Sequence, residues 1–182
     1  MYKRPFVFSF SFSLLFDQQH QQQHPHQPTT NTNISTMATI ALNADYGYTI
    51  AVSVVSSFLV TILGHKVGSY RKEAGVPLPA MYADEAEAKK DKKKMIFNCK
   101  QRVHQNTLEG FTSFMLSLML AGARYPVAAP VLGLIWCAGR IAYSFGYTSG
   151  NPNKRMYGAF GHIGDLGLLG LNAKMAFDMI TA

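Results

Sequence analysis

A run of about 18 uncharged residues, from Tyr46 to Leu63, limits the folds open to this chain more than any other stretch. The run is rich in valine, isoleucine, leucine and phenylalanine, and a helix of about 18 to 20 such residues is long enough to cross a bilayer. Lys66, Arg71 and Lys72 follow it, as expected of cations that reach toward a membrane surface. The run therefore predicts a membrane-spanning helix rather than the core helix of a soluble domain.

Three further apolar segments follow the first. Together they predict an all-α membrane protein, in which four transmembrane helices form an up-down bundle. The expected helices cover about residues 46–70, 97–123, 127–148 and 156–180. Stretches that contain proline and glycine separate these segments, because both residue types favour turns. Residues 41–182 are therefore expected to form one four-helix membrane domain.

Residues 1–40 are predicted to be a disordered or non-native extension of that domain. Lys3 and Arg4 precede an apolar stretch like that of a signal peptide, but no small-x-small cleavage site follows it. The next stretch, 18–26, is rich in glutamine and histidine and cannot build a hydrophobic core. Met37 is a second candidate for the start of translation.

The formal net charge of +7 is concentrated in the stretches between the apolar segments. Ten lysines and arginines lie between residues 66 and 102, and Lys154 and Arg155 precede the fourth segment. Because basic loops tend to face the cytosol, both stretches are expected on the cytosolic side. Basic and aromatic residues do not alternate on a polar platform, so nucleic-acid binding is not expected. The two cysteines lack the spacing of metal ligands, and no metal is expected.

A polar face is predicted on the second helix, where Arg102, Asn106 and Glu109 lie at positions i, i+4 and i+7. Ionisable groups in an apolar helix normally face the interior of a bundle or a water-filled site. The same cytosolic end of the bundle is expected to hold Arg71, Lys72, Tyr143, Tyr147 and Arg155.

These side chains suit a zwitterionic peptide with several carboxylates, together with an apolar co-substrate that arrives from lipid. Arginine binds carboxylates bidentately, a glutamate pairs with an ammonium group, and an asparagine pairs with an amide. In the alternative interpretation, Arg102 and Glu109 pair with each other to hold helices together, and the tyrosines form an aromatic belt. Composition and spacing leave both interpretations open.

Two motifs lie at the expected cytosolic ends of the second and third helices. The first reads Phe97-Asn98-Cys99-x-Gln101-Arg102-x-His104-Gln105-Asn106-x-Leu108-Glu109. The second reads Gly139-Arg140-x-x-Tyr143-x-x-Gly146-Tyr147. Both closely resemble the MAPEG family of integral-membrane eicosanoid and glutathione proteins, and the similarity extends from about Asp45 to the C-terminus.

The resemblance implies a homotrimer of four-helix subunits that binds glutathione, its co-substrate, between neighbouring subunits near the cytosolic face. By position, it implies that glutathione is bound by Arg71, Arg102, His104, Asn106, Glu109, Tyr143 and Tyr147. It also implies that Arg155 is the catalytic residue, which holds the glutathione sulfur as a thiolate. Lys72 and Lys154 are secondary candidates. Lys72 replaces a second arginine of the family, and Arg155 stands one residue later than in the leukotriene-forming relatives.

The activity that the resemblance implies is that of a membrane-bound glutathione transferase and peroxidase. Such an enzyme conjugates lipophilic electrophiles to glutathione or reduces lipid hydroperoxides. The alternative is a non-catalytic member of the family that binds lipids or eicosanoids. The expected location is the endoplasmic reticulum or another organelle membrane, with the active site facing the cytosol.

Overall fold

The computed structural model describes residues 44–149 and 152–182, and every regular element in these ranges is a helix. Five of these elements form a bundle. They are α1 (Tyr46–Ala74), α3 (Lys92–Arg124), α4 (Ala128–Tyr147), the 3₁₀ helix η1 (Pro152–Gly161) and α5 (His162–Thr181), into which η1 continues. A short helix, α2 (Glu85–Lys90), lies in the connection between α1 and α3. The predicted all-helical architecture is therefore confirmed for the described residues.

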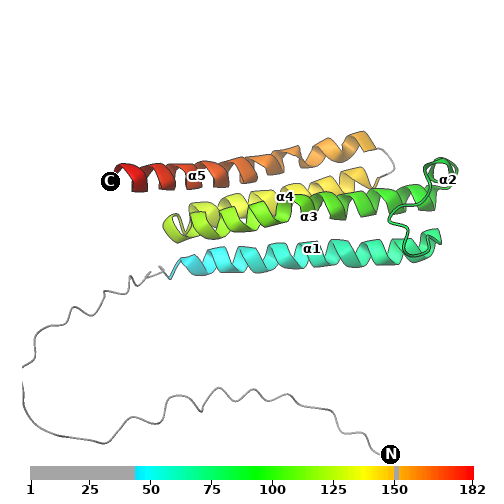
Figure 1. Cartoon of the computed structure of the whole chain (residues 1–182), viewed down its shortest axis with the longest axis horizontal. Helices are drawn as coiled ribbons and strands as arrows, with labels where there is room; N and C mark the ends of the chain where they lie inside the picture. The colour runs from blue at the N-terminus through cyan, green and yellow to red at the C-terminus, as the bar shows by residue number, and fades with distance from the viewer. Residues whose placement is uncertain (1–43, 150–151) are drawn as a thin grey trace, which may run out of the picture. The chain divides into compact units, whose positions relative to one another are not determined.

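The long helices run side by side, with α3 and α4 between α1 and α5 (Figure 1). Helix α3 contacts α1, α4 and α5. The connection that carries α2, the C-terminal end of α4 and the start of η1 lie at the same end of the bundle (Figure 1). The two stretches with the highest density of basic residues are therefore at one end.

Two helices, α1 and α4, are long and apolar enough to cross a membrane. Helix α3 is polar in its N-terminal half, and α5 carries three charged residues, Asp165, Lys174 and Asp178. Helices α1 and α4 therefore suggest membrane association, and the predicted total of four spans stays a prediction.

The core lies where α1, α3, α4 and α5 meet. The rings of Phe114 on α3 and Trp136 on α4 stack with centroids 3.8 Å apart and an interplanar angle of 8°. Val52 of α1 and Leu168 of α5 close the same buried cluster. Between helices in lipid, such side chains stabilise the bundle by van der Waals packing rather than by leaving water.

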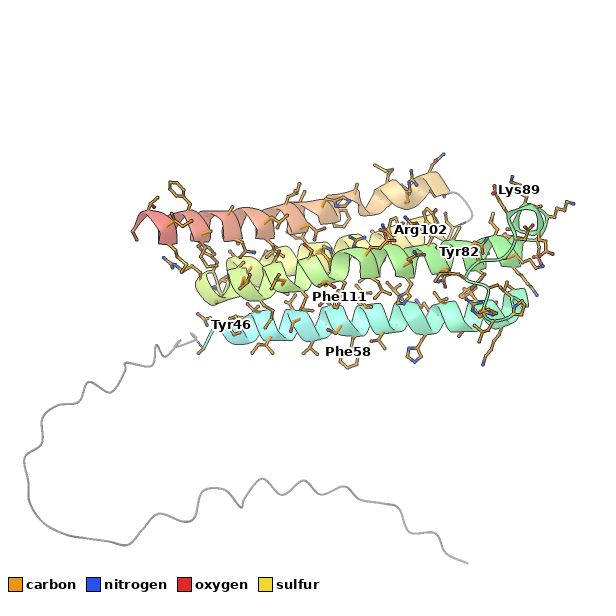
Figure 2. The ribbon with its side chains drawn as sticks, viewed as in Figure 1. Tyr46, Phe58, Tyr82, Lys89, Arg102 and Phe111 are labelled. Carbon is orange, nitrogen blue, oxygen red and sulfur yellow. The ribbon has the colours of Figure 1, made fainter. Side chains whose placement is uncertain are left out.

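Large apolar side chains also cover the outside of the bundle. Phe58 of α1 is 65% exposed and points away from the other helices (Figure 2), and Leu116, Phe145 and Phe177 are similarly exposed. Soluble monomers rarely expose apolar surface on this scale. This surface matches the apolar character of α1 and α4 and suits a lipid environment.

Boundaries of α1 and α3 differ from those expected from hydropathy, as does the start of the last helix, where the 3₁₀ helix η1 precedes α5. Helix α3 begins at Lys92, five residues before the predicted start at 97, because the Asp91 carboxylate accepts a 2.8 Å hydrogen bond from the Lys93 amide. Helix α1 extends to Ala74, where Gly75 takes the left-handed conformation with φ of 63°. Charged residues thus extend both helices past their apolar segments. The predicted extension, residues 1–40, lies outside the described residues.

Candidate functional site

The polar face of α3 is made by side chains one and two helical turns apart. Arg102 Nη1 donates to Glu109 Oε1 at 3.3 Å, and Asn106 Nδ2 donates to Glu109 Oε2 at 3.4 Å. The side chains of Arg102 and Glu109 are 44% and 49% exposed. The ion pair lies within one helix, so it does not hold two helices together, and both groups remain accessible to a ligand.

Helix α4 adds a cation to this face. Arg140 Nη1 donates a 3.0 Å hydrogen bond to Asn106 Oδ1, and its guanidinium carbon lies 5.1 Å from the centre of the Trp136 ring. The predicted site did not include Arg140. The signal was present in the sequence, since an arginine inside an apolar span is costly unless it has a partner.

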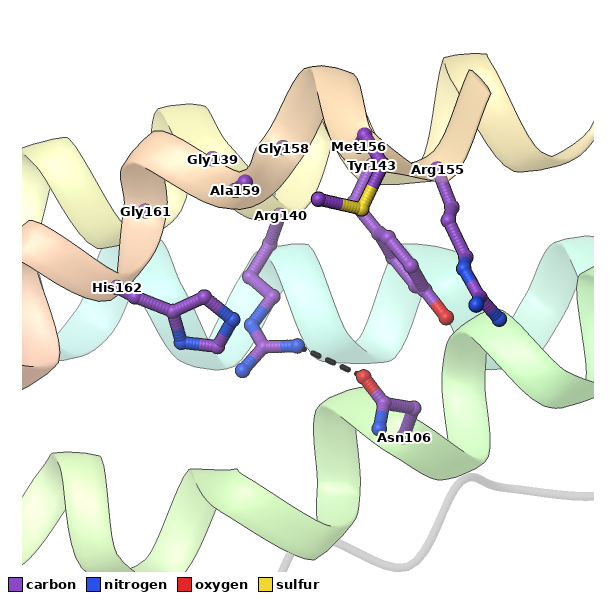
Figure 3. A pocket seen from close by; sticks show the side chains of 10 residues that line it. All are labelled: Asn106, Gly139, Arg140, Tyr143, Arg155, Met156, Gly158, Ala159, Gly161 and His162. Carbon is purple, nitrogen blue, oxygen red and sulfur yellow. Dashed lines mark hydrogen bonds between the residues drawn. The ribbon is translucent and has the colours of Figure 1, made fainter. Parts of the chain in front are cut away.

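A cavity of about 260 Å³ lies between α4, η1 and α3, and we call it the Arg140 cavity (Figure 3). Small residues of α4 and η1, including glycines, form much of its wall. Its polar lining consists of Asn106, Arg140, Tyr143, Arg155 and His162. Figure 3 shows the Tyr143 and Arg155 side chains reaching from α4 and η1 toward α3. Two cations, a phenol and an amide therefore surround one space.

A second cavity, of about 470 Å³, lies beside the first turns of α3, and we call it the Arg102 cavity. Its wall includes Arg102, Tyr147, and Tyr82 and Lys89 from the α1–α3 connection. Tyr147 stacks on Tyr143 with ring centroids 5.5 Å apart. The Tyr143–Tyr147 pair thus contributes one ring to each cavity. Among the predicted site residues, Asn106, Tyr143 and Arg155 line the Arg140 cavity, Arg102 and Tyr147 line the Arg102 cavity, and Glu109 lines neither.

Arg71 and His104 lie away from both cavities. Arg71 donates to the carbonyls of Ala80 and Met81 at 2.5 and 3.5 Å, and its guanidinium lies over the Phe97 ring. Within this subunit it anchors the α1–α3 connection. His104 packs against α1, where a Cβ placed on Gly64 would lie 3.2 Å from the ring. Neither side chain lines a described cavity, and their roles in binding stay predictions.

The two lysines named as secondary candidates also lie outside the cavities. Lys72 is exposed in the last turn of α1. Lys154 is exposed on η1, and its main-chain carbonyl packs against Gly146 of α4. Of the neighbouring pair Lys154 and Arg155, only Arg155 lines the Arg140 cavity.

Two further ionisable residues lie near the Arg140 cavity and were not predicted as site residues. His162 lines the cavity, and its Nδ1 lies 3.7 Å from the Asp165 carboxylate. Asp165 also lines a smaller neighbouring cavity between α3 and α5. In the described part of the chain, no group of three or more His, Cys, Asp or Glu side chains could hold a metal ion.

Comparison with known proteins extends this description. A sequence model of the MAPEG family matches residues 49–174, which is well over half of the chain. An uncharacterized protein of Synechocystis sp. is 34% identical over 108 residues, covering 59% of this chain and 71% of that protein. The family match includes α1, α3, α4 and η1 except for the first residues of α1, and most of α5.

Proposed function

Because this chain belongs to the MAPEG family, we propose that it is a membrane-bound glutathione transferase that also reduces lipid hydroperoxides. The family includes glutathione transferases and peroxidases as well as non-catalytic members. The subtype that we propose is microsomal glutathione S-transferase type 3, whose motifs the sequences of α3 and α4 resemble. The observation that carries the proposal is the Arg102, Asn106 and Glu109 face beside a cavity that Tyr143 and Arg155 line.

The charges of this face complement those of glutathione, which carries two carboxylates, one ammonium group and two amides. Arg102 offers a planar, donor-only group for a carboxylate, and Glu109 offers an acceptor for the ammonium group. Their mutual ion pair is partly exposed, so opening it to admit a ligand costs little, about 1 kcal/mol or less. Asn106 supplies an amide between them.

Arg155 is proposed to stabilise the glutathione sulfur as a thiolate. A free thiol has a pKa of about 8.5, so little thiolate exists at neutral pH without a nearby cation. In transfer, the thiolate attacks an electrophilic carbon and forms a C–S bond as the leaving group departs. In peroxide reduction, it attacks an oxygen of the O–O bond, and the alkoxide that leaves takes a proton to become an alcohol. A second glutathione then displaces water from the resulting sulfenic acid and gives the disulfide.

The assembly is proposed to be a homotrimer in an endoplasmic reticulum or other organelle membrane, with glutathione bound between subunits at the cytosolic face. The orientation is supported by the basic α1–α3 connection and by the start of η1, which lie at one end of the bundle (Figure 1); η1 carries Lys154 and Arg155. In a trimer, the Arg71 and His104 of a neighbouring subunit are expected to complete the glutathione site.

The direct test is glutathione binding to the full chain in detergent, followed by ultraviolet difference absorbance at the thiolate band. Binding with a thiolate signal, together with turnover of an electrophile or a lipid hydroperoxide, is the expected result. Binding without a thiolate signal would favour a non-catalytic member that presents lipids or eicosanoids. A folded protein that does not bind glutathione would overturn the proposal.

Replacing Arg102 with alanine should weaken glutathione binding by about 10- to 100-fold, because a hydrogen bond to a charged group is lost. The assembly should keep its size, since the Arg102 ion pair lies within α3. Isothermal titration calorimetry and size-exclusion chromatography measure the two quantities, with Arg124→Ala at the exposed far end of α3 as the matched control. A smaller assembly with unchanged affinity would show instead that Arg102 serves packing.

A further inference from the structure

We propose that Arg140 is a positioning residue that fixes the orientation of the Asn106 side-chain amide toward the glutathione site. The inference rests on the proposed function, because it concerns the same polar face of α3. The inference adds Arg140 of α4 to the proposed site, and the spacing of the polar residues on α3 does not predict this residue.

The hydrogen bonds of Asn106 allow only one orientation of its amide. Its oxygen accepts from Arg140 at 3.0 Å, and its nitrogen donates to Glu109 at 3.4 Å (Figure 3 shows the first of these). A guanidinium group can only donate hydrogen bonds, and a carboxylate can only accept them. Rotating the amide by half a turn would direct two donors at each other and two acceptors at each other.

Arg140 is itself held in place by the core. Its guanidinium lies over the Trp136 ring at 5.1 Å, and Trp136 is 1% exposed and stacked on Phe114. Gly110 of α3 leaves room beside the guanidinium, since a Cβ placed there would lie 3.4 Å from Arg140 Nη2. A donor held over a buried ring can set the orientation of the group it contacts.

The consequence is a continuous series of polar contacts across two helices. Arg140 orients Asn106, Asn106 donates to Glu109, and Glu109 pairs with Arg102. The contacts to Arg140 and Glu109 hold the Asn106 amide in one orientation before the ligand arrives, which lowers the cost of ordering that amide on binding. Without Arg140, the Asn106 oxygen loses its donor, and only the 3.4 Å hydrogen bond to Glu109 still restrains the amide.

The test is a double-mutant cycle in the full chain, with glutathione affinity measured by isothermal titration calorimetry. Arg140→Met removes the donor but keeps an unbranched apolar side chain, and it should weaken binding by about 10-fold. Because Arg140 acts through Asn106, Arg140→Met should add nothing in an Asn106→Ala background. Arg140→Lys keeps a donor and should recover part of the affinity, and Arg124→Met on α3 should leave affinity unchanged.

The kinetic readout separates positioning from a general loss of structure. Arg140→Met should raise the KM for glutathione and leave kcat at saturating glutathione nearly unchanged, with an unchanged melting temperature. If Arg140→Met does not yield folded protein, the same cycle is measured with Arg140→Gln. This variant keeps a polar side chain on α4, and the same outcomes apply to it.

Two results would overturn the inference and leave the proposed function standing. One is wild-type affinity in Arg140→Met, and the other is a loss of affinity in Arg140→Met that adds fully to that of Asn106→Ala. A wild-type chain that does not bind glutathione would instead refute the proposed function, and the inference with it.

Discussion

Replacing Arg155 with alanine is expected to lower kcat by about 10²- to 10³-fold, the loss typical of removing one group that stabilises a developing or stored anion. Arg155 lines the Arg140 cavity, and its side chain extends toward α3 beside the Tyr143 hydroxyl (Figure 3). In the proposed mechanism it is the cation nearest the glutathione sulfur. The thiolate absorbance of bound glutathione should disappear in the same variant.

The KM for glutathione should change much less than kcat in Arg155→Ala. Glutathione binding is assigned mainly to Arg102, Asn106 and Glu109, whose mutual contacts do not involve Arg155. A group that acts mainly on the reactive anion affects kcat, whereas a group that binds the ground state affects KM. Steady-state kinetics at varied glutathione, with stopped-flow absorbance for the thiolate, measure both quantities.

Lys154→Ala is the matched control for Arg155→Ala. Lys154 neighbours Arg155 in sequence and carries the same charge, but it does not line the cavity. The expected result is near-normal turnover and a normal thiolate signal. If Lys154→Ala loses the signal and Arg155→Ala keeps it, the thiolate role belongs to Lys154. If both variants keep it, neither cation of η1 stabilises the sulfur.

The sequence was sufficient to predict the helices and one face of the site. Hydropathy locates the apolar parts of α1 and α4, and the spacing of Arg102, Asn106 and Glu109 places them on one face of α3. Both are local properties, because residues three, four and seven positions apart on a helix share a face whatever the tertiary structure is.

The partners of that face could not be predicted in the same way. The contact between Arg140 and Asn106 joins residues 34 positions apart, and it depends on how α4 is rotated against α3. His104 illustrates the converse, since it lies between Arg102 and Asn106 in sequence but packs against α1. Helical periodicity defines the faces of one helix, but it does not state which neighbour each face meets.

Arg71 and the start of the last helix show two further limits of the sequence. Arg71 holds the α1–α3 connection by donating hydrogen bonds to the carbonyls of Ala80 and Met81. The position of Arg71 in the sequence does not predict these contacts. The last segment, predicted as one helix from about 156, begins as the 3₁₀ helix η1 and becomes α5 at His162. Nothing in the regular spacing of its glycines predicts that change.

The second substitution with a large expected effect replaces one of those glycines. Glycines allow the main chain of η1 to lie directly on α4. A Cβ placed on Gly158 would lie 2.5 Å from the Gly139 carbonyl oxygen and 2.7 Å from the Tyr143 amide nitrogen. Both obstructing atoms belong to main chain within a helix, so neither can move aside as a side chain can. A substitution here must displace η1 from α4.

Gly158→Ala is therefore expected to destabilise the protein by about 3 kcal/mol, the upper part of the usual range for overpacking. For a chain of this size, that corresponds to a loss of roughly 5–10 °C in melting temperature in detergent. Gly170→Ala on α5 is the matched control, because a Cβ there meets no atom within 4 Å. Replacing glycine by alanine in a helix generally favours the helix, by about 0.5–1 kcal/mol.

The two glycine variants also test whether η1 must be held against α4 for the site to work. Displacing η1 moves Arg155 relative to Tyr143, since the first lies on η1 and the second on α4. Below its melting temperature, Gly158→Ala should therefore lose turnover while Gly170→Ala retains it. Equal melting temperatures and equal turnover in the two variants would mean that η1 accommodates the extra methyl group, and that its close contact with α4 is not required.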